Sequence, residues 1–158
     1  MFTGTVKLSA SGVGAVVTKT LNFVVLPTSD FVKNLNNSVM NLSKAHCATY
    51  AMPMSSAPSS GVICGSDYLG RGEITFTIPY AEHVKNAYFN ISFADNRTDV
   101  WINGKAMGSW DTGDADWSVN ETINLTQEVI DSNGNITVKV EKWCRGGCEF
   151  RAKIVAQY

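Results

Sequence analysis

The sequence predicts a mainly β fold, a sandwich of two sheets, on three observations. Apolar and polar residues alternate in about eight segments, which is the pattern of strands with one buried face. These segments are rich in Val, Ile, Phe and Thr, which favour strands. The chain has 158 residues, 44% of them hydrophobic and 17% charged, as is ordinary for one globular domain with a buried core. We therefore expect residues 1–158 to form a single β-sandwich domain.

The expected strands follow one another along most of the chain. They are TVKLSA (5–10), TLNFVV (20–25), EITFTIP (73–79), AYFNISFA (87–94), TDVWIN (98–103), ETINLT (121–126), NITVKVEKW (135–143) and EFRAKIVAQY (149–158). Asn103 and Gly104 form an Asn-Gly pair, the strongest short signal for a tight hairpin, and Lys105 to Met107 begin the return strand. We therefore expect a hairpin that turns at Asn103-Gly104.

One segment departs from the alternation. Its apolar residues recur at near-helical spacing, at Phe31, Leu35, Val39 and Leu42. Ser29 or Asp30 is placed to cap the first turn. The pattern predicts one short α-helix near residues 30–44, in the N-terminal third of the chain.

The four cysteines suggest two local disulfides. Cys144 and Cys148 bracket Arg-Gly-Gly between two alternating segments, so their side chains would face each other across a hairpin. Cys47 and Cys64 bracket sixteen residues rich in Ser and Pro, which make a poor independent structure unless they are stapled at the neck. The alternative is a four-thiolate zinc site, which usually presents two short pairs of cysteines. Disulfides would place the protein in an oxidising, extracytoplasmic compartment.

Charge and hydropathy argue against two classes of partner. The net charge is -1, from 13 basic and 14 acidic residues without a long run of either sign, which is not the footprint of a nucleic-acid-binding protein. No stretch approaches the roughly 18 to 20 apolar residues that span a bilayer. The first residues lack the pattern of a signal peptide, so we expect a mature chain or an excised piece.

Residues 93–117 hold three of the four tryptophans and five of the fourteen acidic residues, which suggests a ligand site. Carbohydrate sites combine an exposed aromatic ring with polar groups that bind hydroxyls. Such groups are offered here by Trp110 and Trp117 together with Asp111, Asp114, Asp116 and Arg97. In the alternative interpretation, Trp101 and Trp143 are core residues, whereas Trp110 and Trp117 cover an open end of the sandwich.

The same segment offers a weak candidate for calcium. Asp111, Asp114 and Asp116 lie within six residues, and calcium takes six to eight oxygen ligands in flexible geometry. Their spacing is not that of an EF-hand, and a solvated acidic turn explains the same residues. We predict no metal and no cofactor.

No enzyme signature is found. His46 and His83 are the only histidines, and neither belongs to a nucleophile motif; GxSxG, HExxH and glycine-rich phosphate loops are absent from the sequence. Asp95 and Asp99 could in principle act on a glycoside, but any surface hairpin offers such a pair. We therefore expect a protein that is not an enzyme.

From residue 73 onward the order of features resembles the galactose-binding-domain-like jelly roll. Its marks are Ala94-Asp95 before the strand that carries Trp101 and Asn103-Gly104, then Leu125-Thr126 before a turn that ends at Gly134. The resemblance implies a jelly-roll sandwich. It implies no particular ligand, because many functions are found on such sandwiches.

A second resemblance lies in the segment FTGTVKLSASGVGAVVTKTLNFVVLPTSDF (2–31). A short strand is followed there by Thr20 to Phe23 and then by Leu26-Pro27. This order is similar to the start of the variable tip of TraN, the conjugative mating-pair stabilisation protein of F-like plasmids. That family displays its tip on the donor's outer membrane and grips an outer-membrane protein of the recipient. The resemblance implies that residues 1–158 are a recognition domain excised from a longer exported protein.

The expected function is therefore that of a non-enzymatic adhesin tip, which binds an outer-membrane protein of a recipient bacterium from the donor cell surface. The alternative is a carbohydrate-binding module or a phage-type receptor-binding domain. Projecting loops would supply the contacts, and methionines suit surfaces that adapt to a partner. The candidate partner-binding residues are Tyr50, Met52, Pro53 and Met54 in the stapled loop and Trp110, Asp111, Asp114 and Trp117 in the acidic segment. Tyr50 and the two methionines could instead fold back onto the sandwich.

Overall fold

The structure is a computed structural model. It describes residues 3–12, 15–45, 48–52, 59–63, 67–94, 97–111, 118–145 and 149–158. Strands dominate these residues, which include one α-helix, α1 (Thr126–Asp131), and one short 3-10 turn, η1 (Ala81–His83). Within the described ranges no helix has the length and apolar character needed to cross a membrane.

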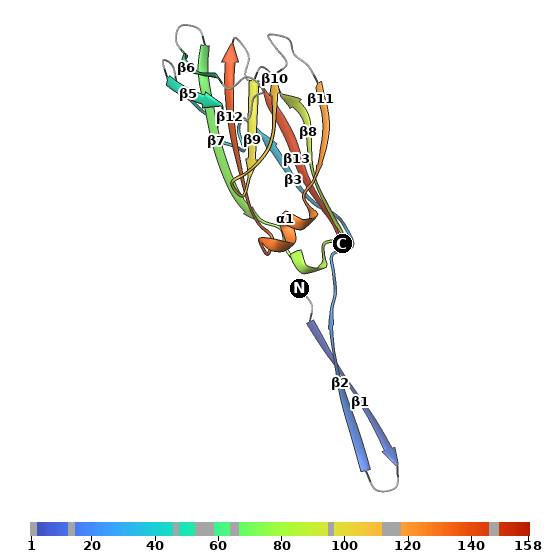
Figure 1. The fold of residues 1–158 in the computed structure, drawn as a ribbon. Helices are drawn as coiled ribbons and strands as arrows, with labels where there is room; N and C mark the ends of the chain where they lie inside the picture. The colour runs from blue at the N-terminus through green and yellow to red at the C-terminus, as the bar shows by residue number, and fades with distance from the viewer. Residues whose placement is uncertain are drawn as a thin grey trace.

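Two antiparallel sheets face each other and form a β-sandwich (Figure 1). Their strands are β3 (Phe31–Asn36), β4 (Ser43–Ala45), β7 (Asp67–Thr77), β8 (Asn86–Ala94), β9 (Arg97–Ile102), β10 (Lys105–Asp111), β11 (Ser118–Asn124), β12 (Asn135–Arg145) and β13 (Phe150–Gln157). The five-stranded sheet has the order β10-β9-β12-β7-β4, and the four-stranded sheet has the order β11-β8-β13-β3.

The strand order is that of a jelly roll. If β3 and β7 to β13 are counted in chain order, the four-stranded sheet places the first, eighth, third and sixth strands side by side. The five-stranded sheet places the second, seventh, fourth and fifth side by side and adds β4 at its edge. The predicted β-sandwich of jelly-roll type is confirmed.

The alternating segments of the sequence all form strands. The two N-terminal segments lie in β1 (Thr3–Gly12) and β2 (Ala15–Val24), and the other six lie in the sandwich. The Asn103-Gly104 turn is also confirmed, since both residues have the positive φ of a tight hairpin, 50° and 78°. Inward-facing residues of both sheets build the core, among them Leu35, Phe89, Ile91, Val100, Val140 and Ile154.

The predicted helix near residues 30–44 is wrong. Residues 31–36 form β3, which pairs with β13, and a turn follows in which Met40 N–H donates to Asn36 O at 2.8 Å. Leu35 and Met40 are buried, whereas Val39 is 38% exposed. The apolar spacing thus reflects a strand and a turn, because hydrogen bonds to β13 hold residues 31–36 extended and a turn follows them.

The α-helix lies elsewhere, in the segment where the sequence suggested a turn. α1 follows β11 and buries Val129, while Leu125 N–H donates to Ala87 O at 2.8 Å. The expected turn comes directly after it and ends at Gly134, whose φ is 77°.

The segment between Cys144 and Cys148 is not the turn of a hairpin. β12 belongs to the five-stranded sheet and β13 to the four-stranded sheet, so the chain crosses between sheets at this point. Cys144 is fully buried and is not a free thiol, while Cys148 lies outside the described residues. The expected cross-strand geometry is therefore wrong, and the pairing of Cys144 with Cys148 stays a prediction.

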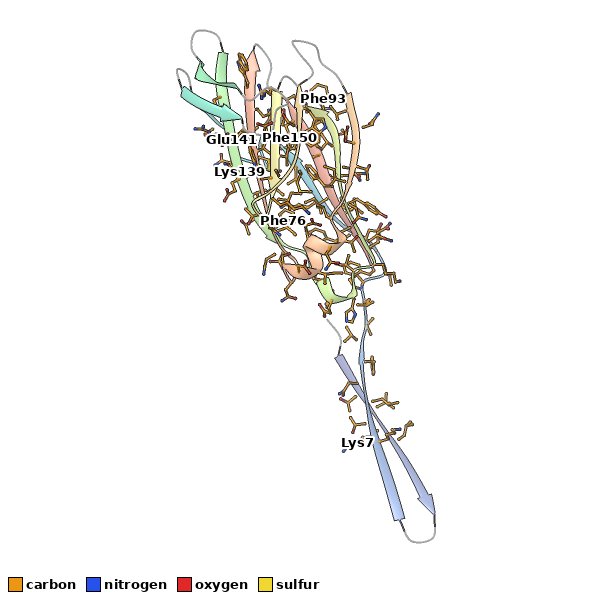
Figure 2. The ribbon with its side chains drawn as sticks, viewed as in Figure 1. Lys7, Phe76, Phe93, Lys139, Glu141 and Phe150 are labelled. Atoms are coloured by element: carbon orange, nitrogen blue, oxygen red, sulfur yellow. The ribbon has the colours of Figure 1, made fainter. Side chains whose placement is uncertain are left out.

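The N-terminal hairpin stands apart from the sandwich. β1 and β2 pair only with each other, and the ribbon extends away from the end of the sandwich at which the C-terminus lies (Figure 1). Lys7 is well separated from the two sheets (Figure 2). Among the described residues, the fold therefore includes a packed sandwich body and a hairpin that projects from it.

Candidate functional site

The projecting hairpin is a regular two-stranded ribbon. Every residue of β1 lies opposite one of β2, from Thr3 opposite Val24 to Gly12 opposite Ala15. Alternate residues of a strand point to opposite faces, and cross-strand partners share a face. The sequence of the hairpin therefore determines what each of its two faces presents.

One face of the hairpin is apolar. Val6 lies opposite Leu21, and Leu8 lies opposite Lys19, so these side chains are neighbours. The exposed fractions are 43% for Val6, 56% for Leu8 and 47% for Leu21. None of these residues belongs to the core cluster found in the described part of the chain. Leu8 and Leu21 therefore neither pack into the sandwich core nor lie under another described element.

Phe23 extends this apolar face at the end near the sandwich. Phe23 lies opposite Gly4, and a Cβ atom added to Gly4 would come within 1.9 Å of the Phe23 ring. The ring thus lies over the glycine, where no side chain competes with it, and it remains 45% exposed. A bulky residue at position 4 would displace the ring, so Gly4 determines where the largest apolar group of the hairpin sits.

The opposite face is polar, and the hairpin is basic. Thr5 lies opposite Asn22, and Lys7 lies opposite Thr20, with all four side chains exposed. Residues 1–29 contain two lysines, Lys7 and Lys19, and no Asp or Glu, although acidic residues outnumber basic ones in the whole chain. Lys19 lies on the apolar face and Lys7 on the polar face. The hairpin therefore presents one apolar strip, and each of its two faces carries one positive charge.

The expected stapled loop is a second, smaller hairpin. β5 (Ala48–Met52) and β6 (Ser59–Ile63) pair with each other, with Ala48 opposite Ile63. Tyr50 and Met52 lie in β5, where the structure describes the backbone alone, and Pro53 and Met54 lie outside the described residues. Cys47 and Cys64 also lie outside them. Ala48 and Ile63, which adjoin Cys47 and Cys64 in the sequence, lie opposite each other. The disulfide between Cys47 and Cys64 stays a prediction.

The acidic segment is described only at its first end. Trp110 is partly buried and packs against the core, with its ring beside Gly108. Asp111 ends β10, and Asp114, Asp116 and Trp117 lie outside the described residues. The carbohydrate and calcium interpretations of this segment thus stay untested. In the described ranges, no three His, Cys, Asp or Glu residues cluster as metal ligands would.

The two strand tryptophans are not core residues, contrary to the alternative considered above. Trp101 and Trp143 are both partly exposed, and they alternate with buried residues on β9 and β12. The Lys139 ammonium lies 4.8 Å from the centre of the Trp101 ring. The core is instead covered at this edge by Trp110 from β10.

The five-stranded sheet carries a group of buried charges that no sequence pattern indicated. Asp99, Arg97 and Glu141 are 0%, 6% and 7% exposed. Glu141 accepts ion pairs from Lys139 at 3.0 Å and from Arg71 at 3.4 Å, and Figure 2 labels Glu141 and Lys139 on this sheet. Strand register brings these residues together, because Glu141 lies opposite both Arg71 and Asp99. The Arg71–Glu141 ion pair links β7 to β12, and Asp99, Arg97 and Glu141 are too buried to form an open site.

Comparison with known proteins identifies no family for the chain. It matches no family model and no curated protein. The geometry of the projecting hairpin and of the sandwich surface therefore carries the functional inference.

Proposed function

We propose that this chain is a non-enzymatic recognition domain, an adhesin tip displayed on the outer surface of a donor cell. Its partner is an outer-membrane protein of a recipient bacterium, which it grips during conjugation. The observation that supports this proposal is the β1–β2 hairpin, a long projecting element whose apolar side chains are not covered by the sandwich.

The resemblance to the TraN tip falls on this same element. The similar segment, residues 2–31, comprises the described strands β1 and β2 and the connection to β3. A rigid sandwich with a protruding ribbon suits a protein that must reach a partner on another cell. The two predicted disulfides, Cys47–Cys64 and Cys144–Cys148, belong to the proposal because they suit an extracytoplasmic domain.

Burial of the apolar strip would provide the binding energy. An isolated two-stranded hairpin is marginally stable in water. A partner that covers the side chains of Val6, Leu8, Leu21 and Phe23 would therefore gain free energy by removing their apolar surface from solvent. Lys7 and Lys19 favour a partner surface that carries carboxylates beside its apolar contacts. Tyr50, Met52, Pro53 and Met54, with Trp110, Asp111, Asp114 and Trp117, remain proposed as further contacts.

A pair of adjacent substitutions tests the hairpin. Leu21→Ser removes an apolar side chain from the strip, whereas Asn22→Ser shortens its neighbour on the polar face. If Leu21 is a hot spot, Leu21→Ser weakens binding by about 1 to 3 kcal/mol, whereas Asn22→Ser has little effect. Both side chains are exposed, so both variants should unfold at the temperature of the parent protein.

The binding partner is identified with the purified chain on a support and solubilised outer membranes of the recipient. The captured protein should be absent from a recipient strain that lacks its gene, and conjugation into that strain should fall. Equal capture by the Leu21→Ser and parent proteins would remove the hairpin from the site. Replacement of residues 48–63 by a short Gly/Ser linker tests the second hairpin in the same assay. Glycan binding with no protein partner at all would instead favour a carbohydrate-binding module.

A further inference from the structure

A hollow of about 410 Å³ lies on the outer face of the four-stranded sheet. Its lining residues belong to β3, β13 and β8, which are neighbouring strands of this sheet (Figure 1). Its polar lining comes from the side chains of Asn34, Asn36, Asn90, Ser92, Arg151 and Lys153. A volume of this size falls in the range of roughly 300 to 1,000 Å³ found for small-ligand sites.

The strand register explains why these side chains converge. Lys153 lies opposite Asn34 of β3 and also opposite Asn90 of β8, so one row across the sheet carries an amide, an ammonium and a second amide. The residues next to them in sequence, such as Leu35 and Ile91, point into the core. The row therefore faces outward from a fixed backbone.

Hydrogen bonds leave both a donor and acceptors available on this face. Asn36 Oδ1 accepts from Val39 N–H at 2.9 Å, which orients the amide and leaves its NH₂ group for a ligand. Ser92 Oγ donates to Arg151 O at 3.2 Å and keeps its own acceptor capacity. Asn90 Oδ1 is shielded from solvent and accepts no hydrogen bond from the described residues. The last torsion of an Asn side chain is broad, so rotation of this amide would present Oδ1 to a ligand hydroxyl in the hollow.

The charge of the hollow is low. Arg151 is ion-paired with Glu149, and its guanidinium lies 5.5 Å from the centre of the Phe93 ring. Lys153 forms no ion pair with a carboxylate among the residues that the structure describes. One unpaired ammonium among amides and a hydroxyl suits neutral, hydroxyl-bearing ligands better than phosphates, which usually need clustered cations.

A second hollow continues the first. It has a volume of about 270 Å³ and shares Asn36 and Arg151 with its larger neighbour, while Ser38 and Glu149 add to its lining. The two hollows together offer a track rather than a single pocket. A chain of sugar units fits such a track better than one ring.

We propose that this track binds a neutral oligosaccharide of the cell surface. The amides of Asn34, Asn36 and Asn90 and the Lys153 ammonium hydrogen-bond its hydroxyl groups, and Glu149 accepts from hydroxyls in the smaller hollow. The site is separate from the projecting hairpin, so this inference does not depend on the proposed protein partner. The same chemistry serves a glycan of the lipopolysaccharide or a sugar on a receptor.

The test is titration of the ¹⁵N-labelled full chain with neutral disaccharides of glucose, galactose and N-acetylglucosamine, with their monosaccharides, with a neutral O-antigen oligosaccharide of lipopolysaccharide, and with inorganic phosphate. Amide signals of β3, β8 and β13 should shift, and oligosaccharides should bind more tightly than the single sugars. Asn90→Leu keeps a side chain of similar size without its polar atoms and should lower the association constant about tenfold. Lys153→Met is a second variant, should Asn90→Leu fail to fold.

Thr122→Val is the matched control. Thr122 lies opposite Asn90 on β11, is exposed and does not line the hollow, so its replacement should leave sugar binding unchanged. Absence of binding by every saccharide at millimolar concentration overturns the proposal. Binding that survives both Asn90→Leu and Lys153→Met also overturns it, as does stronger binding of inorganic phosphate at the same signals. Leu21→Ser in the hairpin should not alter sugar binding, so the two proposals fail independently.

Discussion

Asn103 and Thr137 form two hydrogen bonds with each other. Asn103 N–H donates to Thr137 O at 2.9 Å, and Thr137 N–H donates to Asn103 Oδ1 at 2.8 Å. Asn103, in the tight β9–β10 turn, thereby anchors the start of β12. The turn therefore helps to keep β12 paired with β9 in the five-stranded sheet. Sequence alone identified the turn but not this link.

The two roles of Asn103 can be separated by substitution. Asn103→Gly removes the side-chain acceptor but tolerates the φ of 50°, and we expect a loss of about 1 kcal/mol in the free energy of unfolding. Asn103→Ala adds the strain of a left-handed backbone, a further cost of about 1 to 2 kcal/mol. Urea unfolding of both variants measures the difference. An alanine variant as stable as the glycine variant would contradict the assigned strain.

Gly134 should tolerate alanine far less well than Gly104. Both have a φ near +78°, at 77° and 78°, but a Cβ on Gly134 would lie 2.1 Å from Ile78 O, whereas one on Gly104 would meet no atom within 4 Å. We expect Gly104→Ala to cost about 1 to 2 kcal/mol of unfolding free energy and Gly134→Ala about 3 kcal/mol or more. Thermal unfolding compares the two directly. Equal losses would mean that Ile78 shifts without cost.

The Lys105–Glu128 ion pair should make the free energy of unfolding depend on pH in the acidic range. The hydrogen bond from the Lys105 ammonium lowers the pKa of Glu128, partial burial opposes it, and the charge of Lys105 adds to the lowering. Because the folded pKa lies below the unfolded one, this contribution is present above about pH 4.5 and disappears as pH falls through the folded pKa. Lys105 is largely exposed, so the effect is small. NMR titration should show a raised Glu128 pKa in Lys105→Met; an unchanged value would contradict the pairing.

Tyr158 should matter at alkaline pH. Burial raises the pKa of its phenol, the neighbouring Tyr80 raises it further, and the hydroxyl donates to Pro79 O at 2.7 Å. With the folded pKa above the unfolded one, the contribution to stability is present below about pH 10 and is lost as pH rises through the folded pKa. Tyr158→Phe should flatten this alkaline decline, as followed by unfolding in urea at several pH values. A decline identical to that of the parent would assign it to other groups.

The predicted disulfides can be mapped directly. Non-reducing peptide mapping of the oxidised protein should find Cys47 linked to Cys64 and Cys144 linked to Cys148. Cys144 is buried where the chain crosses between sheets, so reduction should destabilise the sandwich at that end by about 2 to 4 kcal/mol. Four free thiols, a cross-pairing or bound zinc would refute the assignment.

Local patterns predicted the strands well because one buried face leaves a period of two in the sequence. The pattern failed at β3, where Lys33 takes the position between the inward residues Phe31 and Leu35. The Lys33 side chain is only partly buried, and its ammonium lies 5.6 Å from the centre of the Phe76 ring. With a lysine in the apolar row, the spacing of four between Phe31 and Leu35 looks helical.

Other features depend on contacts far apart in the sequence. Nothing local distinguishes a hairpin from a crossing between sheets after Cys144, because the destination of β13 is set by β3 and β8. The exposure of Leu8 and Leu21 is likewise a tertiary property, since the same alternation describes a covered strand. The candidate hairpin was thus visible as two strands, but its projection from the sandwich was not.

The hairpin also determines how this protein should behave at high concentration. Each of its strands is hydrogen-bonded on one side only within the described chain, so both outer edges offer unpaired backbone groups to another ribbon. An open edge beside an apolar strip is a template for fibrous self-association, and Lys7 and Lys19 are the charges that oppose stacking of one copy on the next. Neutralising the two lysines should therefore make the hairpin a nucleus for aggregation.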